Sequence, residues 1–144
     1  MINVYIDTTG SMTEMGKDSA VLYIAKSIQD YCDFKNIQTS FYKLDNTEIL
    51  KLEAINFSND IQLNIGSIQS NSILIGDGLF EFEDQKIFDI SLSIGIDSDL
   101  LSLKKVSKKV FDNDSVLSAL EYLIYHNNLL DNNSKEVEED NDEW

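Results

Sequence analysis

The chain has 144 residues, of which 42% are hydrophobic, and it carries a formal net charge of −15 at pH 7. This length and composition predict a single globular domain with a substantial hydrophobic core. Because 26 acidic side chains stand against 11 lysines and no arginine, the charge argues against a nucleic-acid partner and lowers the expectation of phosphate chemistry.

The cellular location is predicted from the length of the apolar runs and from the single cysteine. No apolar run approaches the roughly 18 residues of a membrane-spanning helix. The lone Cys32 lies on the apolar stripe of a predicted helix, which fits a buried thiol in a reducing compartment. We therefore expect a cytoplasmic protein with no membrane partner.

The first predicted element is a buried strand that ends in oxygen-bearing side chains. Residues 2–6 are mostly apolar or β-branched, and Asp7, Thr9 and Ser11 follow at a spacing of two. A loop leaving the strand would direct three hard oxygens to one point, which suits a cation such as Mg²⁺ or Mn²⁺. The same residue types are common in turns, so an ordinary turn without a metal is the alternative.

The next elements predict a right-handed strand–helix–strand unit. Apolar residues at helical spacing predict a helix over about 18–34, with Asp18 or Ser19 as its N-cap. Residues 37–44 predict a second strand, and residues 48–52 predict a short antiparallel edge strand after a turn. Within residues 54–71 the pattern predicts only a short helix beginning near Ser58.

The second half of the chain repeats the opening pattern. Residues 72–76 form a compact apolar run, and Asp77 follows between two glycines, which predicts a central parallel strand. The remaining expected elements are a strand over 88–96, a helix over 98–108, an edge strand at 110–111 and a final helix from 116, capped by residues 112–115. The lone His126, near the end of that helix, is expected at the surface.

Two regions are expected. Residues 1–130 should form one compact α/β domain, a three-layer α/β/α Rossmann-like fold with a central, mostly parallel sheet. Residues 131–144 are dominated by acidic and amide side chains and should form a disordered tail.

The segment Asp7-Thr8-Thr9-Gly10-Ser11-Met12 resembles the Asp-x-Ser/Thr-Gly-Ser-Met signature of von Willebrand factor type A domains. In that family the signature opens a metal-ion-dependent adhesion site. An Asp-Gly after the fourth strand supplies its second part, and Asp77-Gly78 takes that place here, with Gly76 where the family usually has threonine. The family's remaining ligand is a threonine between these parts. This chain has no threonine from 48 to 76, and Ser58 is the best substitute, ahead of Ser67 and Ser70.

The resemblance implies a non-enzymatic module that binds another protein through a metal ion. The implied ligands of Mg²⁺ or Mn²⁺ are Asp7, Thr9, Ser11, Asp77 and Ser58. The implied partner contacts are Thr8, Gly10 and Gly78, and an open coordination position would accept a carboxylate from the partner. The resemblance also suggests the classes of partner, namely an ATPase, a kinase or another effector protein.

Two other functions remain open. Asp7-x-Thr9-Gly10-Ser11 also resembles the haloacid dehalogenase signature, in which Asp7 would be the nucleophile of a magnesium-dependent phosphatase. In that interpretation Asp77 and Glu81 form the acidic metal motif, and Thr39 or Ser40 supplies a hydroxyl. Against it, Thr9 stands where soluble phosphatases usually carry a second Asp, and no lysine is clearly placed to bind phosphate.

The third possibility is a degenerate domain that has kept the fold and binds no metal. Such a protein would act as a scaffold or an inhibitor through its acidic surface.

Overall fold

The computed structural model describes residues 1–57, 67–79 and 85–129. Within these residues the chain forms a six-stranded sheet with the strand order β3-β2-β1-β4-β5-β6. The strands are β1 (Ile2–Ile6), β2 (Thr39–Lys43), β3 (Glu48–Ile49), β4 (Ser72–Gly76), β5 (Phe88–Ser93) and β6 (Ser107–Asp112).

The sheet is parallel except at one edge. β1 pairs in parallel with both β2 and β4, β4 with β5 and β5 with β6, whereas β3 runs antiparallel to β2. The mostly parallel sheet and its antiparallel edge strand are therefore confirmed. β3 is shorter than the predicted 48–52, because the chain turns into the 3-10 helix η2 (Leu52–Ala54).

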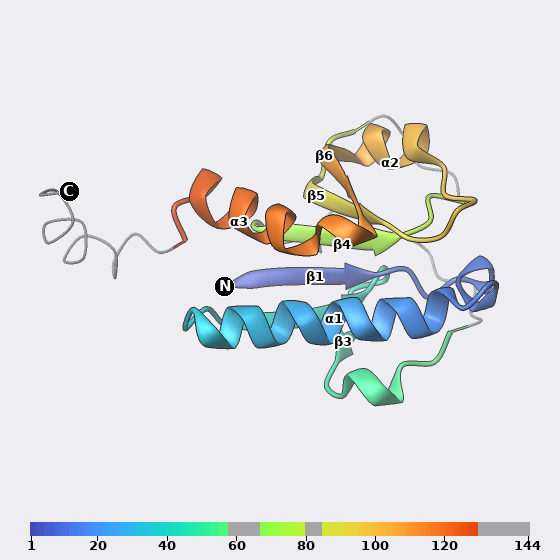
Figure 1. Cartoon of the computed structure of the whole chain (residues 1–144), viewed down its shortest axis with the longest axis horizontal. Coiled ribbons are helices and arrows are strands. Elements are labelled where there is room, and N and C mark those ends of the chain that lie inside the picture. Colours follow the sequence, from blue (N-terminus) through green and yellow to red (C-terminus); the bar gives the residue numbers. More distant parts are fainter. Residues whose placement is uncertain (58–66, 80–84, 130–144) are drawn as a thin grey trace, which may run out of the picture.

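Helices cover both faces of the sheet (Figure 1). They are α1 (Lys17–Phe34), α2 (Leu100–Val106) and α3 (Val116–His126), with the short 3-10 helices η1 (Gly10–Thr13) and η4 (Asn113–Ser115). Buried residues of α1 and α3 pack with one face of the sheet, and those of α2 pack with the other. The three-layer α/β/α Rossmann-like fold is confirmed.

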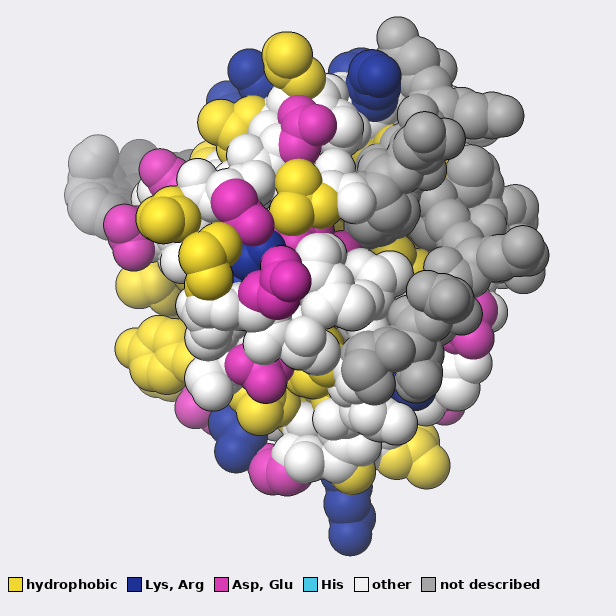
Figure 2. Space-filling view, turned by 90° about the vertical axis from the view of Figure 1, so that its right-hand side faces the viewer, with side chains coloured by type: hydrophobic (Ala, Val, Ile, Leu, Met, Phe, Trp, Pro, Cys, Tyr) yellow, Lys and Arg dark blue, Asp and Glu magenta, His cyan; other side chains and the backbone are white. Residues whose placement is uncertain are grey.

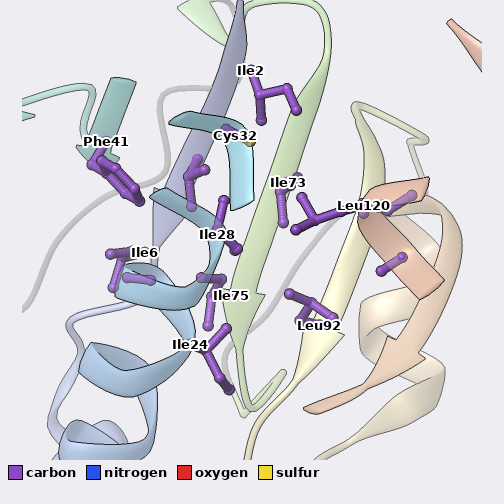
Figure 3. Packing of buried hydrophobic residues seen from close by; sticks show 14 of the residues in the cluster. Ile2, Ile6, Ile24, Ile28, Cys32, Phe41, Ile73, Ile75, Leu92 and Leu120 are labelled. Atoms are coloured by element: carbon purple, nitrogen blue, oxygen red, sulfur yellow. The ribbon is translucent and has the colours of Figure 1, made fainter. Parts of the chain in front are cut away.

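The larger core lies between the sheet and the pair α1 and α3 (Figure 3). Alternate residues of β1, among them Ile2 and Ile6, point into this core and meet Ile28 of α1. The intervening Tyr5 faces the opposite layer, where it packs with Leu74 of β4. Because β1 is buried on both faces, its sequence is an almost continuous apolar run.

The ends of α1 and α3 differ from prediction. Asp18 and Ser19 are not the N-cap of α1; the helix starts at Lys17, after Gly16 with φ +72°. The cap predicted for the last helix is also wrong, since residues 113–115 form η4 and Ser115 makes no side-chain capping bond. At the start of α1 the backbone N–H of Lys17 donates to the carbonyl of Glu14 and that of Ser19 donates to the Asp18 carboxylate, so these N–H groups are satisfied without a side chain at the N-cap.

The edge of the sheet beside α2 is longer than predicted. Asp99 caps α2 by accepting a hydrogen bond from the backbone N–H of Ser102 at 3.2 Å. The helix ends at Val106, and Ser107 already begins β6, so the predicted edge strand at 110–111 extends over six residues.

Several expectations concern single residues or lie outside the described chain. Cys32 is buried and His126 is exposed, as predicted, with the His126 ring stacked on Tyr122. The helix expected near Ser58 and the acidic tail fall outside the described residues, and the division into one domain and a tail stays a prediction. None of the helices in the described part of the chain combines the length and apolar character that crossing a membrane requires.

Candidate functional site

The two predicted aspartates meet where the strand order reverses. From β1 the chain builds β2 and β3 on one side of the sheet and β4, β5 and β6 on the other. Ile6 pairs with Ile75, and the backbone N–H of Asp7 donates to the carbonyl of Ile75 at 2.9 Å. Ligands of open α/β sheets bind at this kind of switch point, outside the carboxyl ends of the strands.

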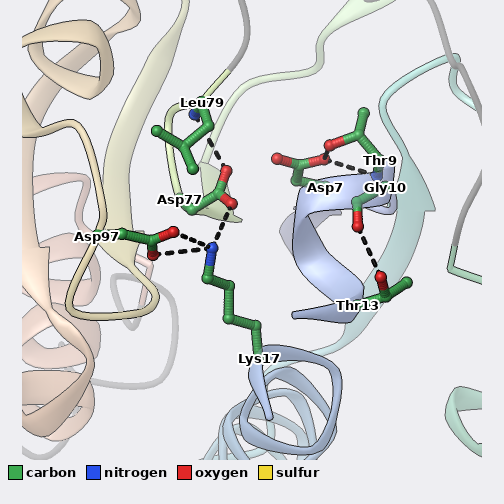
Figure 4. A network of polar contacts seen from close by, with 8 residues as sticks. All are labelled: Asp7, Thr9, Gly10, Thr13, Lys17, Asp77, Leu79 and Asp97. Carbon is green, nitrogen blue, oxygen red and sulfur yellow. Dashed lines mark hydrogen bonds and ion pairs between the residues drawn. The ribbon is translucent and has the colours of Figure 1, made fainter. Parts of the chain in front are cut away.

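Asp7 is fully buried, and in the described part of the chain only one of its carboxylate oxygens is hydrogen-bonded. Oδ1 accepts from the backbone N–H of Thr9 at 2.9 Å and from Thr9 Oγ1 at 2.6 Å. Oδ2 has no hydrogen-bond partner among the residues that the structure describes, and it points to the side on which Asp77 lies (Figure 4).

This environment makes Asp7 a weak acid. Its pKa is raised to about 6, chiefly by burial and also by the neighbouring carboxylate of Asp77, against the lowering effect of the two Thr9 hydrogen bonds. Two carboxylates that face each other in a buried site favour a proton or a cation between them.

Gly76 makes room for the Asp7 side chain. A Cβ atom at position 76 would lie 3.0 Å from Asp7 Cβ and 3.3 Å from Asp7 Oδ2. The Asp7 carboxylate therefore occupies the space that a side chain at position 76 would need.

Asp77 forms an ion pair with Lys17, which was not among the site residues predicted from the sequence. Its Oδ1 accepts from the backbone N–H of Leu79 at 3.0 Å, and its Oδ2 accepts from Lys17 Nζ at 2.9 Å. The same Nζ lies 2.8 Å and 2.9 Å from the two carboxylate oxygens of Asp97, which follows β5 (Figure 4).

Lys17 is 1% exposed and keeps its charge. Burial lowers its pKa, but the hydrogen bonds to Asp97 and Asp77 outweigh burial, so the pKa lies above its ordinary value. The helix dipole disfavours a lysine in the first turn of a helix by about 0.3–1 kcal/mol, so the position of Lys17 at the start of α1 is a weak signal in the sequence for nearby carboxylates.

The other predicted residues divide between the surface and the interior. Ser11 lies in η1 and is partly exposed, and Gly10 beside it is exposed. Thr8 and Gly78 are buried, so neither lies on the surface that a partner would contact. Gly78 has φ +73°, and a Cβ there would lie 2.5 Å from the carbonyl oxygen of Asp99, which makes it a structural glycine. Ser58 lies outside the described residues.

Three hydroxyls considered from the sequence are at the wrong edge of the sheet. Thr39 and Ser40 begin β2, where they pair with Ile2 and Asn3. Ser70 precedes β4, and its carbonyl accepts a hydrogen bond from Asn3 Nδ2 at 2.8 Å. All three therefore lie at the amino edge, across the sheet from Asp7. Glu81 lies outside the described residues.

The oxygen atoms at the site are of the kind that a hard divalent cation prefers, but the number of carboxylates that could bind it directly is small. Asp7 Oδ2 is a buried carboxylate oxygen that lacks a donor within residues 1–57, 67–79 and 85–129, and hydroxyls of Thr9 and Ser11 follow on the same loop. In the described part of the chain, however, no three His, Cys, Asp or Glu side chains form a group able to hold a metal. A cation here would take hydroxyl, water or partner oxygens besides carboxylates.

Comparison with known proteins does not identify a family, so the assignment of a function rests on the geometry of the site. No protein-family model matches the chain, and no curated protein matches it in sequence.

Proposed function

We propose that this protein is a divalent-cation-dependent module that binds another protein at the carboxyl edge of its sheet, without catalysis. The observation that carries the proposal is Asp7 Oδ2, a buried carboxylate oxygen without a donor among the described residues, beside a second carboxylate at the switch point. Asp77 lies beside Asp7 and shares the ammonium of Lys17 with Asp97, so one ammonium does not balance the negative charge of the three carboxylates, which favours protons or a cation.

Each residue has a distinct part in this proposal. Thr9 and Ser11 offer hydroxyl oxygens to Mg²⁺ or Mn²⁺, and Asp7 and Asp77 hold the water molecules around the ion. Thr9 also fixes the Asp7 carboxylate through Oδ1, which leaves Oδ2 directed at the site. When bound, the cation would offer an open coordination position to a carboxylate of the partner.

Exposed apolar side chains at the same edge support a protein partner. The loops that follow β1, β4 and β5 and the first turn of α2 carry large hydrophobic residues in contact with solvent, and Ile96 is 97% exposed. Figure 2 views this edge and shows hydrophobic side chains around acidic and basic ones. The residues are Met15, Leu79, Ile96, Leu100 and Leu101. Large apolar side chains that are exposed together on one face of a protein are typical of protein-binding surfaces.

The class of partner and the location remain part of the proposal. The resemblance to von Willebrand factor type A domains suggests an ATPase, a kinase or another effector protein. A cytoplasmic location is supported by the buried, unpaired thiol of Cys32.

One observation favours the metal-free scaffold as a second candidate. Lys17 already neutralises Asp77, so part of the charge that would attract a cation is balanced by the protein. The phosphatase interpretation has less support, because Thr39 and Ser40 lie at the opposite edge and the ammonium of Lys17 is held by two carboxylates.

Calorimetric titration tests the proposal. Mg²⁺ or Mn²⁺ is titrated at about 0.15 M salt into the wild type, Asp7→Asn and Asp30→Asn, and the same samples are assayed on a phosphate ester. We expect saturable binding to the wild type, an affinity about 10- to 100-fold weaker for Asp7→Asn, and no turnover. Asp30 is an exposed residue of α1, so its replacement removes one carboxylate far from the carboxyl-edge loops and should leave the affinity unchanged.

The other outcomes select the alternatives. Absence of saturable binding to the wild type at millimolar concentrations would favour the metal-free scaffold. Turnover that disappears in Asp7→Asn would make the protein a phosphatase.

A further inference from the structure

The ammonium of Lys17 occupies a position built for it at the site. Its Nζ makes contacts of 2.8–2.9 Å with Asp77 and Asp97, two residues that are distant in sequence from α1. Asp77 is fully buried, and the side chain of Asp97 is 32% exposed. A buried lysine is tolerated in a fold when carboxylates pair with it in this way.

The loop after β5 is shaped around the lysine stem. Gly95 has φ +90°, and a Cβ atom there would lie 2.7 Å from Lys17 Cε. The backbone N–H of Asp99 donates to the carbonyl of Asp77 at 2.7 Å, which ties this loop to the end of β4. The loop therefore accommodates Lys17 and presents Asp97 to it at the same time.

Asp7 and Asp77 differ in whether each of their carboxylate oxygens already accepts a hydrogen bond. Both oxygens of Asp77 already receive a hydrogen bond, one from Leu79 and one from Lys17. Asp7, in contrast, has Oδ2 without a donor among the described residues. A cation attracted to this pair would therefore share Asp77 with an ammonium group.

We infer that Lys17 is a built-in cation of the site, which neutralises Asp77 in the absence of a divalent ion and competes with that ion for the charge of Asp77. This inference rests on the proposed function and adds its regulation. The ammonium keeps the carboxyl edge stable without metal, and its positive charge weakens metal binding. Because Lys17 lowers the affinity for the divalent cation, the fraction of protein that holds the cation varies with the cation concentration.

Two variants test the inference in opposite directions. Lys17→Met removes the charge and keeps an unbranched side chain of similar length, so Mg²⁺ affinity should rise by about tenfold or more. Asp97→Asn leaves Lys17 with Asp77 as its ionised partner and removes one negative charge, so Mg²⁺ affinity should fall. Both are measured by calorimetry at about 0.15 M salt.

Matched controls separate these effects from net charge. Lys26 lies on the same helix and pairs with Glu53 at 2.8 Å on the surface, so Lys26→Met makes the same charge change away from the site. Asp30→Asn is the equivalent control for Asp97→Asn. Neither control should change Mg²⁺ affinity.

Thermal unfolding gives a second readout. In the chelator-treated protein, Lys17→Met should unfold at a lower temperature than Lys26→Met, because Asp77 and Asp97 lose their counterion. Added Mg²⁺ should raise the melting temperature of Lys17→Met more than that of the wild type.

The outcomes distinguish this inference from the proposed function. If the wild type binds Mg²⁺ and Lys17→Met binds it equally or more weakly, the inference is wrong and the proposed function stands. Binding by Lys17→Met alone supports the inference and overturns the proposed function for the wild type, and no binding by either protein overturns both. If Lys17→Met does not fold, Asp97→Asn decides: weaker binding supports the inference, and equal or tighter binding overturns it.

Discussion

Asp7 is a residue whose ionisation opposes folding. Its ordinary pKa of 3.8 applies in the unfolded chain, whereas burial and the neighbouring Asp77 raise the folded value to about 6. The folded state therefore binds the proton more tightly. In the metal-free protein this residue makes folding most favourable below about pH 4, and stability is lost as the pH rises to about 6.

Replacing the carboxyl by an amide removes this dependence. We expect Asp7→Asn to gain about 1–3 kcal/mol in unfolding free energy over the wild type at about pH 7.5, and much less at about pH 4. Urea unfolding with a chelator at both pH values measures the difference, and effects of carboxylates distant from Asp7 cancel in it. An equal difference at the two pH values would show that Asp7 does not titrate between them.

The second residue that defines the site is Lys17. A lysine in the first turn of a helix is usually exposed to solvent. In the folded chain, however, Lys17 is buried against Asp77 and Asp97. The motif around Asp7 was visible in the sequence because its residues are neighbours. Lys17 and Asp97 are 80 positions apart, so nothing local links them.

At the scale of elements, the C-terminus of α1 depends on a left-handed residue. Asn36 has φ +60°, its N–H donates to the carbonyl of Asp33, and the N–H of Ile37 donates to the carbonyl of Cys32 at 2.8 Å. This pattern closes the helix and directs the chain into β2. Glycine adopts such a conformation without steric cost, whereas alanine does not.

We therefore expect opposite effects from two substitutions at this position. Asn36→Gly should raise the unfolding free energy by up to about 1 kcal/mol, and Asn36→Ala should lower it by about 1–2 kcal/mol. Urea unfolding measures both. Asp30→Gly, in the middle of α1, should cost about 0.5–1 kcal/mol, which would show that glycine stabilises only at the left-handed position. A loss in Asn36→Gly would contradict this account of the helix end.

The elements themselves were largely predictable. β1 and β4 are short apolar runs that end at an aspartate, and α1 follows the helical period of its buried residues. The predicted starts of the helices were less accurate, because short turns such as η4 stand where side-chain caps were expected. Thr39 and Ser40 were misjudged for a simpler reason, since residues that begin a parallel strand lie at the edge opposite Asp7.

For the whole molecule, the charge of −15 has a general effect on stability. Repulsion among like charges disfavours the compact state, and salt screens it. We expect the melting temperature to rise as NaCl increases from about 0.02 M to about 0.3 M. If the site binds a cation specifically, MgCl₂ should raise it further than NaCl at equal ionic strength.

A comparison of variants separates screening from binding at the site. The extra effect of MgCl₂ should disappear in Asp7→Asn and persist in Asp30→Asn, while both respond to NaCl as the wild type does. Differential scanning fluorimetry measures all three proteins. An equal MgCl₂ effect in Asp7→Asn would assign the stabilisation to the general acidic surface.

The sequence by itself determined the α/β class, the two strand ends that carry Asp7 and Asp77, and the edge at which they meet. These features follow from local periodicity and from the rule that parallel strands end at one edge of the sheet. Only the tertiary structure decided how the charges there are balanced. Burial, the loop around Gly95 and the packing of α1 bring Lys17 between Asp77 and Asp97, and such long-range contacts exist only once the layers are packed together.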